Sequence, residues 1–282
     1  MLARVATAVV GIPLIGWAST STSVWPFKLL ILAIGMLMFW EFNSVEGVAK
    51  KWWAWILALV LIIVCLLPVP LFGENGFDFV FAIAFILLLP FDYILLLDPE
   101  RPIVTRQFVW LFLPLGVLTW LRSIELTVHS GQNNLPADLG ASITDGSVIL
   151  LLFLCLWAGD TAAFIIGRAL GRRKLAPAIS PNKTWEGAIA NLVAASVVGF
   201  AIGPLFGDDP GSPIGPYLGL GVGAIVGVLG QVGDLYESAW KRRHGVKDSG
   251  NLLPGHGGVL DRFDSLLFSA PAVATLFALV RL

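Results

Sequence analysis

The chain has 282 residues, of which 57% are apolar and only 13% are charged, with 11 Trp and 18 Phe. Because about a quarter of the residues of an ordinary soluble domain are charged, this composition excludes that class and favours a membrane protein. The formal net charge of −1 gives no support for a nucleic-acid partner. The two cysteines, Cys65 and Cys155, lie in apolar runs and fit neither a disulfide framework nor a zinc site.

Apolar stretches long enough to cross about 30 Å of hydrocarbon as helices recur along the chain. We therefore predict an all-α polytopic membrane protein with about nine transmembrane helices. The first stretch resembles a secretory signal, but its charged segment is only Arg4 and further spans follow, so we interpret it as a retained helix. The predicted spans lie near residues 5–19, 27–44, 52–72, 78–97, 106–122, 147–169, 185–206, 215–236 and 263–281.

Lys and Arg residues are distributed unequally between the two sides of these spans. If the N-terminus is cytoplasmic, 15 of the 18 fall on the inner side, and only Lys28, Arg122 and Arg281 fall outside. Cytoplasmic loops keep such an excess of positive charge, so we predict a cytoplasmic N-terminus and an outer C-terminus. A polar loop at 123–146 separates N-terminal transmembrane helices, 1–122, from a C-terminal part, 147–282, that carries the polar cytoplasmic loops.

Small residues recur at helical spacing in two of the C-terminal spans. In 215–236, a row of glycines leads to Asp234, which we place on the same face at the inner end of the helix. In 147–169, Gly159, Ala163 and Gly167 form a similar row beside Asp160. Close helix packing alone would explain the glycines, and Asp160 could instead form an ion pair with Arg168. A carboxylate inside a span is costly, however, and is usually functional.

The inner loop before the span at 185–206 contains Ser180, Pro181 and Lys183. A capping residue followed by proline predicts the start of a helix at Ser180. Free N–H groups at such a start, together with Lys183, favour phosphate binding. The alternative is a basic loop that only touches anionic lipid headgroups.

Residues 233–265 combine carboxylates, Lys and Arg side chains, and two histidines with a glycine-rich turn. Asp261 and Asp264 are three residues apart and share a helix face. With Asp234 they could offer several oxygens to Mg²⁺, which suits phosphoryl or nucleotidyl transfer. The glycines around His256 would let backbone N–H groups approach a phosphate. Asp261 as a helix cap and His256 as a loop-orienting group are the structural alternatives.

The same segment resembles the signature of the phosphatidate cytidylyltransferases. A second element of that family is similar to Trp157, Asp160, Thr161 and Gly167 together with 180–187, although Phe164 replaces an expected tyrosine and Asn182 a common lysine. The matching residues of the signature are Ser238, Lys241, Arg242, Lys247, Asp248, Gly250, Leu253, Pro254, His256, Gly257, Gly258, Asp261, Arg262 and Asp264.

The resemblance implies transfer of CMP from CTP to phosphatidate, giving CDP-diacylglycerol and pyrophosphate. It implies Mg²⁺ held by Asp234, Asp261 and Asp264, with a second cation as an open alternative. Asp160 and Asp248 are expected to orient the basic side chains. The expected phosphate-binding residues are Lys241, Arg262, Arg242, Lys247 and Lys183, with Ser180, Thr184, His256, Gly257 and Gly258 supporting them.

The expected location is the bacterial inner membrane, with the site facing the cytoplasm, CTP and phosphatidate as substrates, and a homodimer as an open alternative. A CTP-dependent lipid or polyprenol kinase would share the nucleotide, the metal and the membrane. An ion-coupled secondary transporter is the alternative from another class, because buried acids and glycine-rich spans also mark ion pathways. Transporters, however, place such groups near the midplane in both halves.

Overall fold

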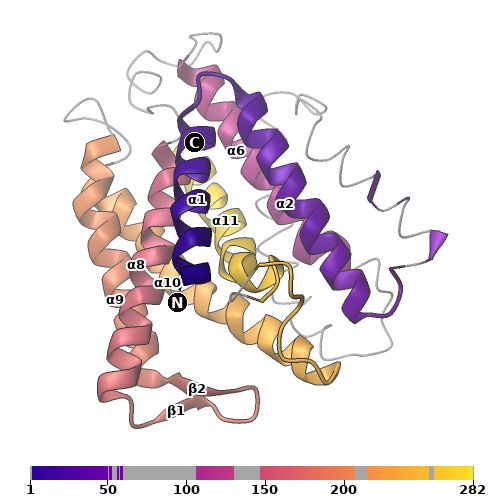
Figure 1. The fold of residues 1–282 in the computed structure, drawn as a ribbon. Helices are drawn as coiled ribbons and strands as arrows, with labels where there is room; N and C mark the ends of the chain where they lie inside the picture. Colours follow the sequence, from indigo (N-terminus) through magenta and orange to yellow (C-terminus); the bar gives the residue numbers. More distant parts are fainter. Residues whose placement is uncertain are drawn as a thin grey trace.

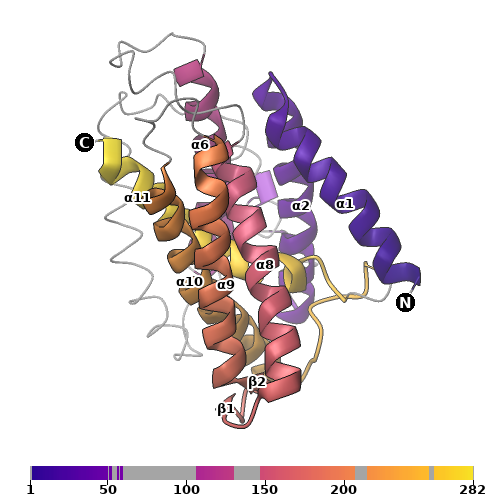
Figure 2. The same cartoon turned by 90° about the vertical axis from the view of Figure 1, so that its left-hand side faces the viewer.

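The computed structural model describes residues 2–49, 51–52, 56, 58–59, 106–129, 147–206, 215–253 and 257–281. Within these ranges the chain is almost entirely helical, and its helices lie side by side in an elongated bundle (Figures 1 and 2). Most of the predicted span at 52–72, all of the span at 78–97 and most of the 123–146 loop lie outside the described residues. The count of nine spans and the positions of the two termini relative to the membrane therefore stay predictions.

The N-terminal part contributes helices α1 (Leu2–Thr20), α2 (Val24–Val45) and α6 (Leu113–His129). A π-helical turn, η1 (Phe108–Phe112), leads directly into α6. Helix α2 begins where expected for a capped start, because the Ser23 hydroxyl accepts a hydrogen bond from the backbone N–H of Trp25.

The C-terminal part consists of four long helices and a β-hairpin. The helices are α8 (Ser147–Leu170), α9 (Trp185–Ile202), which ends in the 3₁₀ turn η2 (Gly203–Phe206), α10 (Pro216–Arg243) and α11 (Leu260–Arg281). Strands β1 (Lys174–Ala176) and β2 (Ser180–Thr184) join α8 to α9 and lie at one end of the bundle (Figure 1). Helix α10 lies between α9 and α11, so the elements that carry the predicted acids are neighbours.

Four of the described helices are long and apolar enough to cross a membrane, which supports an integral membrane protein. They run over Val24–Val45, Val148–Leu170, Trp185–Leu205 and Pro216–Arg243. Each overlaps a span predicted from the sequence. Helix α10 extends seven residues beyond the predicted end of its span, from 236 to 243, and this extension carries Lys241 and Arg242 toward the polar end of the bundle.

The helix start predicted at Ser180 is wrong, and the fold is therefore not purely α-helical. Ser180 begins strand β2, which pairs in antiparallel fashion with β1. Helix α9 begins after Thr184, whose extended backbone (φ −127°, ψ 155°) and side-chain hydrogen bond from the N–H of Gly187 form the cap. Pro181 lacks an N–H and restricts the residue before it, so it fits a two-stranded hairpin better than a continuing helix.

The glycine rows bring helix backbones into contact, as predicted. A Cβ atom on Gly219 would collide with the carbonyl oxygen of Gly199, and one on Gly223 with that of Ala195. Helices α9 and α10 therefore touch along their main chains, as in the small-residue packing common in membranes. A Cβ atom on Gly233 would lie 2.6 Å from the Asp264 carbonyl oxygen, so α11 also lies against α10 at this level.

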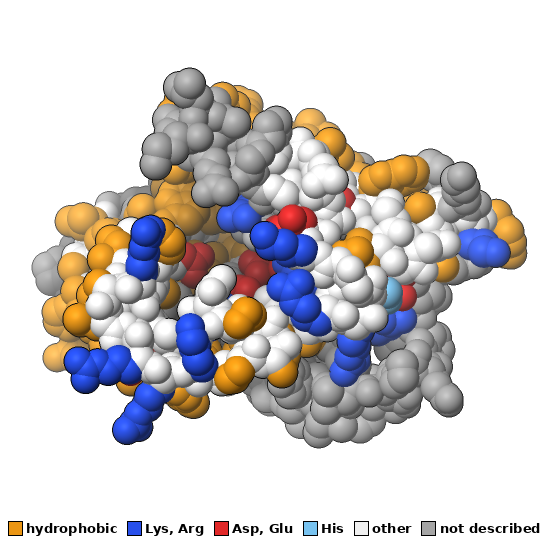
Figure 3. Space-filling model, turned by 60° about the horizontal axis from the view of Figure 1, so that its bottom comes forward, with side chains coloured by type: hydrophobic (Ala, Val, Ile, Leu, Met, Phe, Trp, Pro, Cys, Tyr) orange, Lys and Arg blue, Asp and Glu red, His pale blue; other side chains and the backbone are white. Residues whose placement is uncertain are grey.

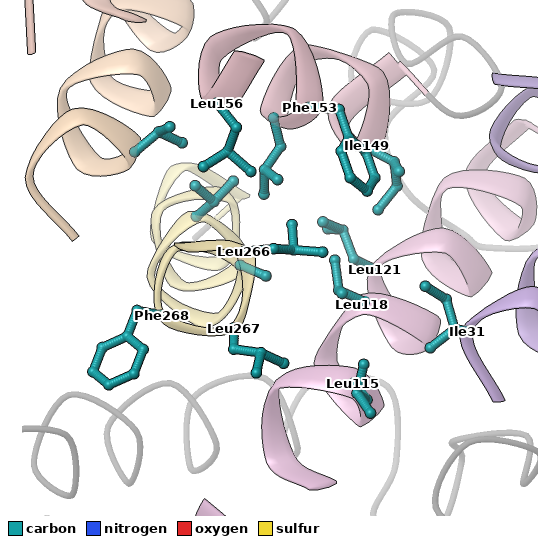
Figure 4. Packing of buried hydrophobic residues seen from close by; sticks show 14 of the residues in the cluster. Ile31, Leu115, Leu118, Leu121, Ile149, Phe153, Leu156, Leu266, Leu267 and Phe268 are labelled. Carbon is teal, nitrogen blue, oxygen red and sulfur yellow. The ribbon is translucent and has the colours of Figure 1, made fainter. Parts of the chain in front are cut away.

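The largest hydrophobic cluster lies between the two parts of the chain. In Figure 4, Ile149, Phe153 and Leu156 of α8 and Leu266 of α11 point toward Leu118 and Leu121 of α6, with Ile31 of α2 beyond them. Dispersion contacts in such a cluster hold the acid-bearing helices against the N-terminal part.

An aromatic cluster joins α2 to the polar end of α10. The rings of Phe42 and Trp240 are stacked with centroids 5.0 Å apart, and Trp110 packs edge-on against both. Glu46 accepts hydrogen bonds from Arg106 at 2.7 Å and from the indole N–H of Trp240, one of these rings, at 2.8 Å. The end of α10 is therefore anchored to the N-terminal part.

Candidate active site

Acidic side chains gather in a hollow at the end of the bundle that carries the β-hairpin. Figure 3 views this end and shows the acids within the hollow, with Lys and Arg side chains around them. The surrounding helices are apolar, so the charged side chains are concentrated at this end of the bundle. The predicted residues fall into two neighbouring groups within this region.

The first group contains Asp160 of α8, Asp234 of α10, Asp264 of α11 and Lys183 of β2. The Lys183 Nζ lies 2.7 Å from Asp234 Oδ2 and donates to Gln231 at 3.3 Å. The Asp234 side chain is 40% exposed, so a molecule in water can reach it. This contact brings strand β2 against the acid-bearing end of α10.

Asp264 lies deeper than Asp234, whereas Asp160 is exposed. Asp160 Oδ1 accepts a hydrogen bond from Asn191 Nδ2 at 3.2 Å. This partner lies on α9, whereas the sequence suggests an ion pair with Arg168 as the alternative. Asp264 is buried and accepts a hydrogen bond from the N–H of Ser265 at 2.7 Å. Asp160, Asp234 and Asp264 repel one another electrostatically, and Lys183 attracts both Asp160 and Asp264.

The second group contains Glu237 and Lys241 of α10 and Asp261 of α11. Lys241 Nζ donates to Glu237 Oε2 at 2.7 Å and also to Asp261 Oδ1. Glu237 is almost fully buried, and its other oxygen, Oε1, has no hydrogen-bond partner. Glu237 and Asp264 interact electrostatically, which joins the two groups. Lys241, predicted to bind phosphate, is thus held between two acids.

Asp261 is held by the connection that precedes α11. Its Oδ2 accepts hydrogen bonds from the N–H of Gly258 at 2.7 Å and from both the N–H and the hydroxyl of Ser249, at 3.0 and 3.1 Å. Gly257 has φ +82°, a left-handed conformation that favours glycine, and a Cβ atom there would lie 2.8 Å from Asp261. Asp261 is the second residue of α11, and these hydrogen bonds join it to the preceding connection and not to the free N–H groups of the helix, so they do not support the helix-cap alternative.

The remaining predicted residues lie at the rim or elsewhere. Arg242 donates to the carbonyl oxygens of Ile179 and Val246, which joins α10 to the hairpin. Arg262, Lys247 and Asp248 are exposed. Ser180 and Thr184 belong to the hairpin as described above, and His256 lies outside the described residues.

Two buried acids in this region were not predicted from the sequence. Glu237 lies one turn before Lys241 on α10, a spacing that is typical of a helical ion pair and could have revealed it. Glu41 lies in the apolar helix α2 and contacts the connection before α11. An acid within an apolar span was the available signal for Glu41, but its partner is more than 200 residues away.

The sequence predicted a Mg²⁺ site that includes Asp234 and Asp264 of the first group. No set of three His, Cys, Asp or Glu side chains in the described part of the chain converges closely enough to enclose a metal. The single positive charge of Lys183 offsets only part of the negative charge of Asp160, Asp234 and Asp264. Mg²⁺ typically takes one or two carboxylates and completes its shell with water and phosphate, so these residues fit the ion.

Comparison with known proteins supports a nucleotide-dependent reaction. The model of the cytidylyltransferase family matches residues 2–280. A phosphatidate cytidylyltransferase of Bacillus subtilis (strain 168) is 33% identical over 262 residues, covering 90% of this chain and 89% of the relative. That of Staphylococcus haemolyticus (strain JCSC1435) is 49% identical over 137 residues, covering 48% of this chain. The match spans about half the length, 51%, of the Staphylococcus relative.

Proposed function

The chain belongs to the cytidylyltransferase family, and from this premise we propose that it transfers CMP from CTP to phosphatidate, giving CDP-diacylglycerol and pyrophosphate. The observation that carries the proposal is the meeting of three acids and Lys183 at the polar end of an apolar bundle. A nucleotide can reach this place from water, and a lipid headgroup can reach it from the membrane.

The reaction needs little covalent help from the protein. An oxygen of the lipid phosphate attacks the α-phosphorus of CTP, a new P–O bond forms, and the bond between the α-phosphorus and the bridging oxygen breaks. The electron pair leaves with pyrophosphate. Because the attacking phosphate is already an anion, no strong general base is required. The main task is to bring two polyanions together, which depends on positioning and on positive charge.

The basic side chains that would bind the phosphates lie on different sides of the site. Lys183 approaches from the hairpin, and Lys241 and Arg262 belong to the side formed by α10 and the start of α11. When phosphate enters, Lys241 can exchange part of its contact with Glu237 and Asp261 for the substrate. Arg242, Lys247 and Asp248 lie farther out, where they suit the attraction and orientation of the incoming nucleotide.

Asp234 and Asp264, with Asp160 close by, are the residues that would hold Mg²⁺. A bound Mg²⁺ would neutralise charge on the transferred phosphate and orient its oxygens. Asp261 is less suited to bind Mg²⁺ directly than the sequence suggests, because both of its oxygens already accept hydrogen bonds. Asp261 would instead hold Lys241 and the connection before α11 in place.

The setting follows from the same features. We place the protein in the cytoplasmic membrane of a bacterium, with the hairpin end facing the cytoplasm, because the relatives named above are bacterial and Lys and Arg side chains surround the acids at this end (Figure 3). Association of two copies remains compatible with this arrangement, and nothing in the proposed chemistry requires it.

An assay with purified protein tests the proposal. Protein in detergent or liposomes is supplied with CTP labelled in the cytosine ring, phosphatidate and Mg²⁺, and lipid products are separated. We expect the cytosine label to enter a lipid. A lipid fraction without the label, combined with phosphorylation of a prenol or diacylglycerol in parallel reactions, would establish a CTP-dependent kinase instead.

A further inference from the structure

A buried acid in the N-terminal part of the chain contacts the connection that carries Asp261. Glu41 belongs to helix α2, and it is only 4% exposed. Neighbouring positions on this helix are almost all apolar, and a carboxylate buried among them is costly unless its oxygens are hydrogen-bonded. Its partners therefore indicate what it does.

Within the part of the chain that the structure describes, the hydrogen-bond partners of the Glu41 carboxylate lie between residues 249 and 260. Oε1 accepts a hydrogen bond from the N–H of Val259 at 2.8 Å. Oε2 accepts one from the N–H of Leu260 at 2.8 Å and one from the Ser249 hydroxyl at 3.1 Å. The two N–H groups are at the start of α11, where helices have donors without partners and favour negative charge. Glu41 thus caps α11 from another helix.

Glycines in the connection before α11 leave space for the Glu41 carboxylate. A Cβ atom on Gly250 would lie 2.7 Å from Glu41 Oε1, and one on Gly258 would lie 2.6 Å from Oε2. Real Cβ atoms essentially never approach this closely, so glycine at both positions allows the backbone to close around Glu41.

The groups that hold Glu41 also hold Asp261. The Ser249 hydroxyl lies 3.1 Å from both Glu41 Oε2 and Asp261 Oδ2. The Ser249 N–H and the Gly258 N–H, each beside a Glu41 contact, donate to Asp261 Oδ2. The opposite oxygen, Asp261 Oδ1, is then directed at Lys241. The chain of contacts runs from α2 through the connection to the second acidic group of the site.

We infer that Glu41 is a positioning residue for the reaction: it fixes the connection before α11, and through it the Asp261 carboxylate that orients Lys241. This inference rests on the proposed function for its catalytic consequence. It also gives the N-terminal part a role at the site, although none of the site residues predicted from the sequence belongs to that part.

Helix α2 supplies a matched control. Glu46 is also a buried carboxylate at the same end of the helix, and it also joins the two parts of the chain. Its partners are Arg106, Trp240 and His244, and among the described residues of 249–260 none forms a hydrogen bond or ion pair with it. A purely structural role would make Glu41→Gln and Glu46→Gln behave alike.

The two variants are compared by hydrogen exchange and by kinetics in the full-length protein. Glutamine keeps the size of the side chain, but its NH₂ group would face a donor from Leu260 or Ser249. For Glu41→Gln we expect amide exchange at Val259 and Leu260 to rise by about 10-fold or more. We expect kcat to fall by about 10-fold or more, with a smaller change in KM for CTP. Glu46→Gln should leave exchange at these two amides and kcat close to those of the unsubstituted protein.

Each outcome decides a different claim. An active unsubstituted protein with unchanged exchange and kcat in Glu41→Gln would overturn the role of Glu41. Equal losses in both variants would show that Glu41 contributes only to stability and would overturn the inference as well.

If Glu41→Gln does not fold, Ser249→Ala provides the test. A kcat lowered by about 3-fold or more supports the contacts from Glu41 through Ser249 to Asp261, and an unchanged kcat contradicts them. Inactivity of the unsubstituted protein toward CTP and phosphatidate would instead overturn the proposed function, while the exchange result still decides the anchoring of 249–260.

Discussion

The Nζ atom of Lys183, in a strand of the β-hairpin, lies 2.7 Å from a carboxylate oxygen of Asp234, at the end of the glycine-lined face of α10. This contact closes the hollow between the hairpin and the bundle. It also places a positive charge beside the acids that would bind Mg²⁺. When CTP binds, the same ammonium group is positioned to transfer its contact from Asp234 to a phosphate.

The first prediction concerns this lysine. Lys183→Gln removes a charged hydrogen bond to phosphate, which is typically worth about 1.5–3 kcal/mol, so kcat/KM for CTP should fall by about 10- to 100-fold. Lys174→Gln, an exposed lysine of the other strand, is the matched control and should change kcat/KM by less than about 2-fold. Steady-state kinetics measure both. Equal effects of the two substitutions would show that the hairpin acts through general positive charge.

The second prediction concerns Asp261. Asp261→Asn weakens the contact with Lys241 and turns an amide toward one of the donors that Asp261 now accepts from. We expect turnover to fall by at least about 100-fold while folding and membrane insertion persist. Turnover and thermal unfolding are measured on the same preparation. Rates like those of the unsubstituted protein would exclude a role of this acid at the site.

The third prediction concerns the metal. Removal of divalent ions should abolish activity, and Mg²⁺ should restore it. Asp234→Asn and Asp264→Asn should each raise the Mg²⁺ concentration that gives half-maximal rate by about 10-fold or more. Titration of the rate with Mg²⁺, supported by isothermal titration of Mg²⁺ into the protein with a non-hydrolysable CTP analogue, provides the measurement. An unchanged Mg²⁺ requirement in both variants would place the ion elsewhere.

The fourth prediction concerns helix packing. Gly223→Ala would press a methyl group against the Ala195 carbonyl, and overpacking of this kind typically costs about 1–3 kcal/mol. Gly11→Ala, on α1 where a Cβ atom would meet nothing within 4 Å, should be neutral or slightly stabilising. Thermal unfolding in detergent compares the two. If Gly223→Ala is as stable as Gly11→Ala, the contact between α9 and α10 is looser than described.

The fifth prediction concerns topology. A cysteine at the exposed Ala178, in a background without Cys65 and Cys155, should react with a membrane-impermeant maleimide only from the cytoplasmic side. A reporter fused after Leu282 should read as non-cytoplasmic if nine spans are present. Labelling of position 178 from outside intact cells would reverse the proposed orientation.

The features that the sequence predicted well depend on local pattern. Long apolar runs predict helices because length and hydropathy suffice, and the row that includes Gly219 and Gly223 predicts backbone contact because a single helix face carries it. The error at Ser180 arose because a serine followed by proline suits both a helix start and a short strand, and only the pairing with β1 decides between them.

The features that the sequence did not predict depend on contacts between distant segments. Glu41 lies far from Val259 and Leu260 in the chain, and no spacing rule relates them. The placement of Lys241 between Glu237 and Asp261 likewise depends on how α10 and α11 pack. The signature includes Lys241, Asp261 and Asp264, but only the fold shows that Lys183 pairs with Asp234 and that Lys241 pairs with Glu237 and Asp261.

The position of the transferred phosphate tests the central claim most directly. Parallel reactions of purified protein and phosphatidate receive CTP labelled in either the α- or the γ-phosphate. Transfer of CMP predicts that the α-label enters the lipid and the γ-label appears in pyrophosphate. Entry of the γ-label into lipid, with the α-label retained in CDP, would identify a kinase and contradict the assignment.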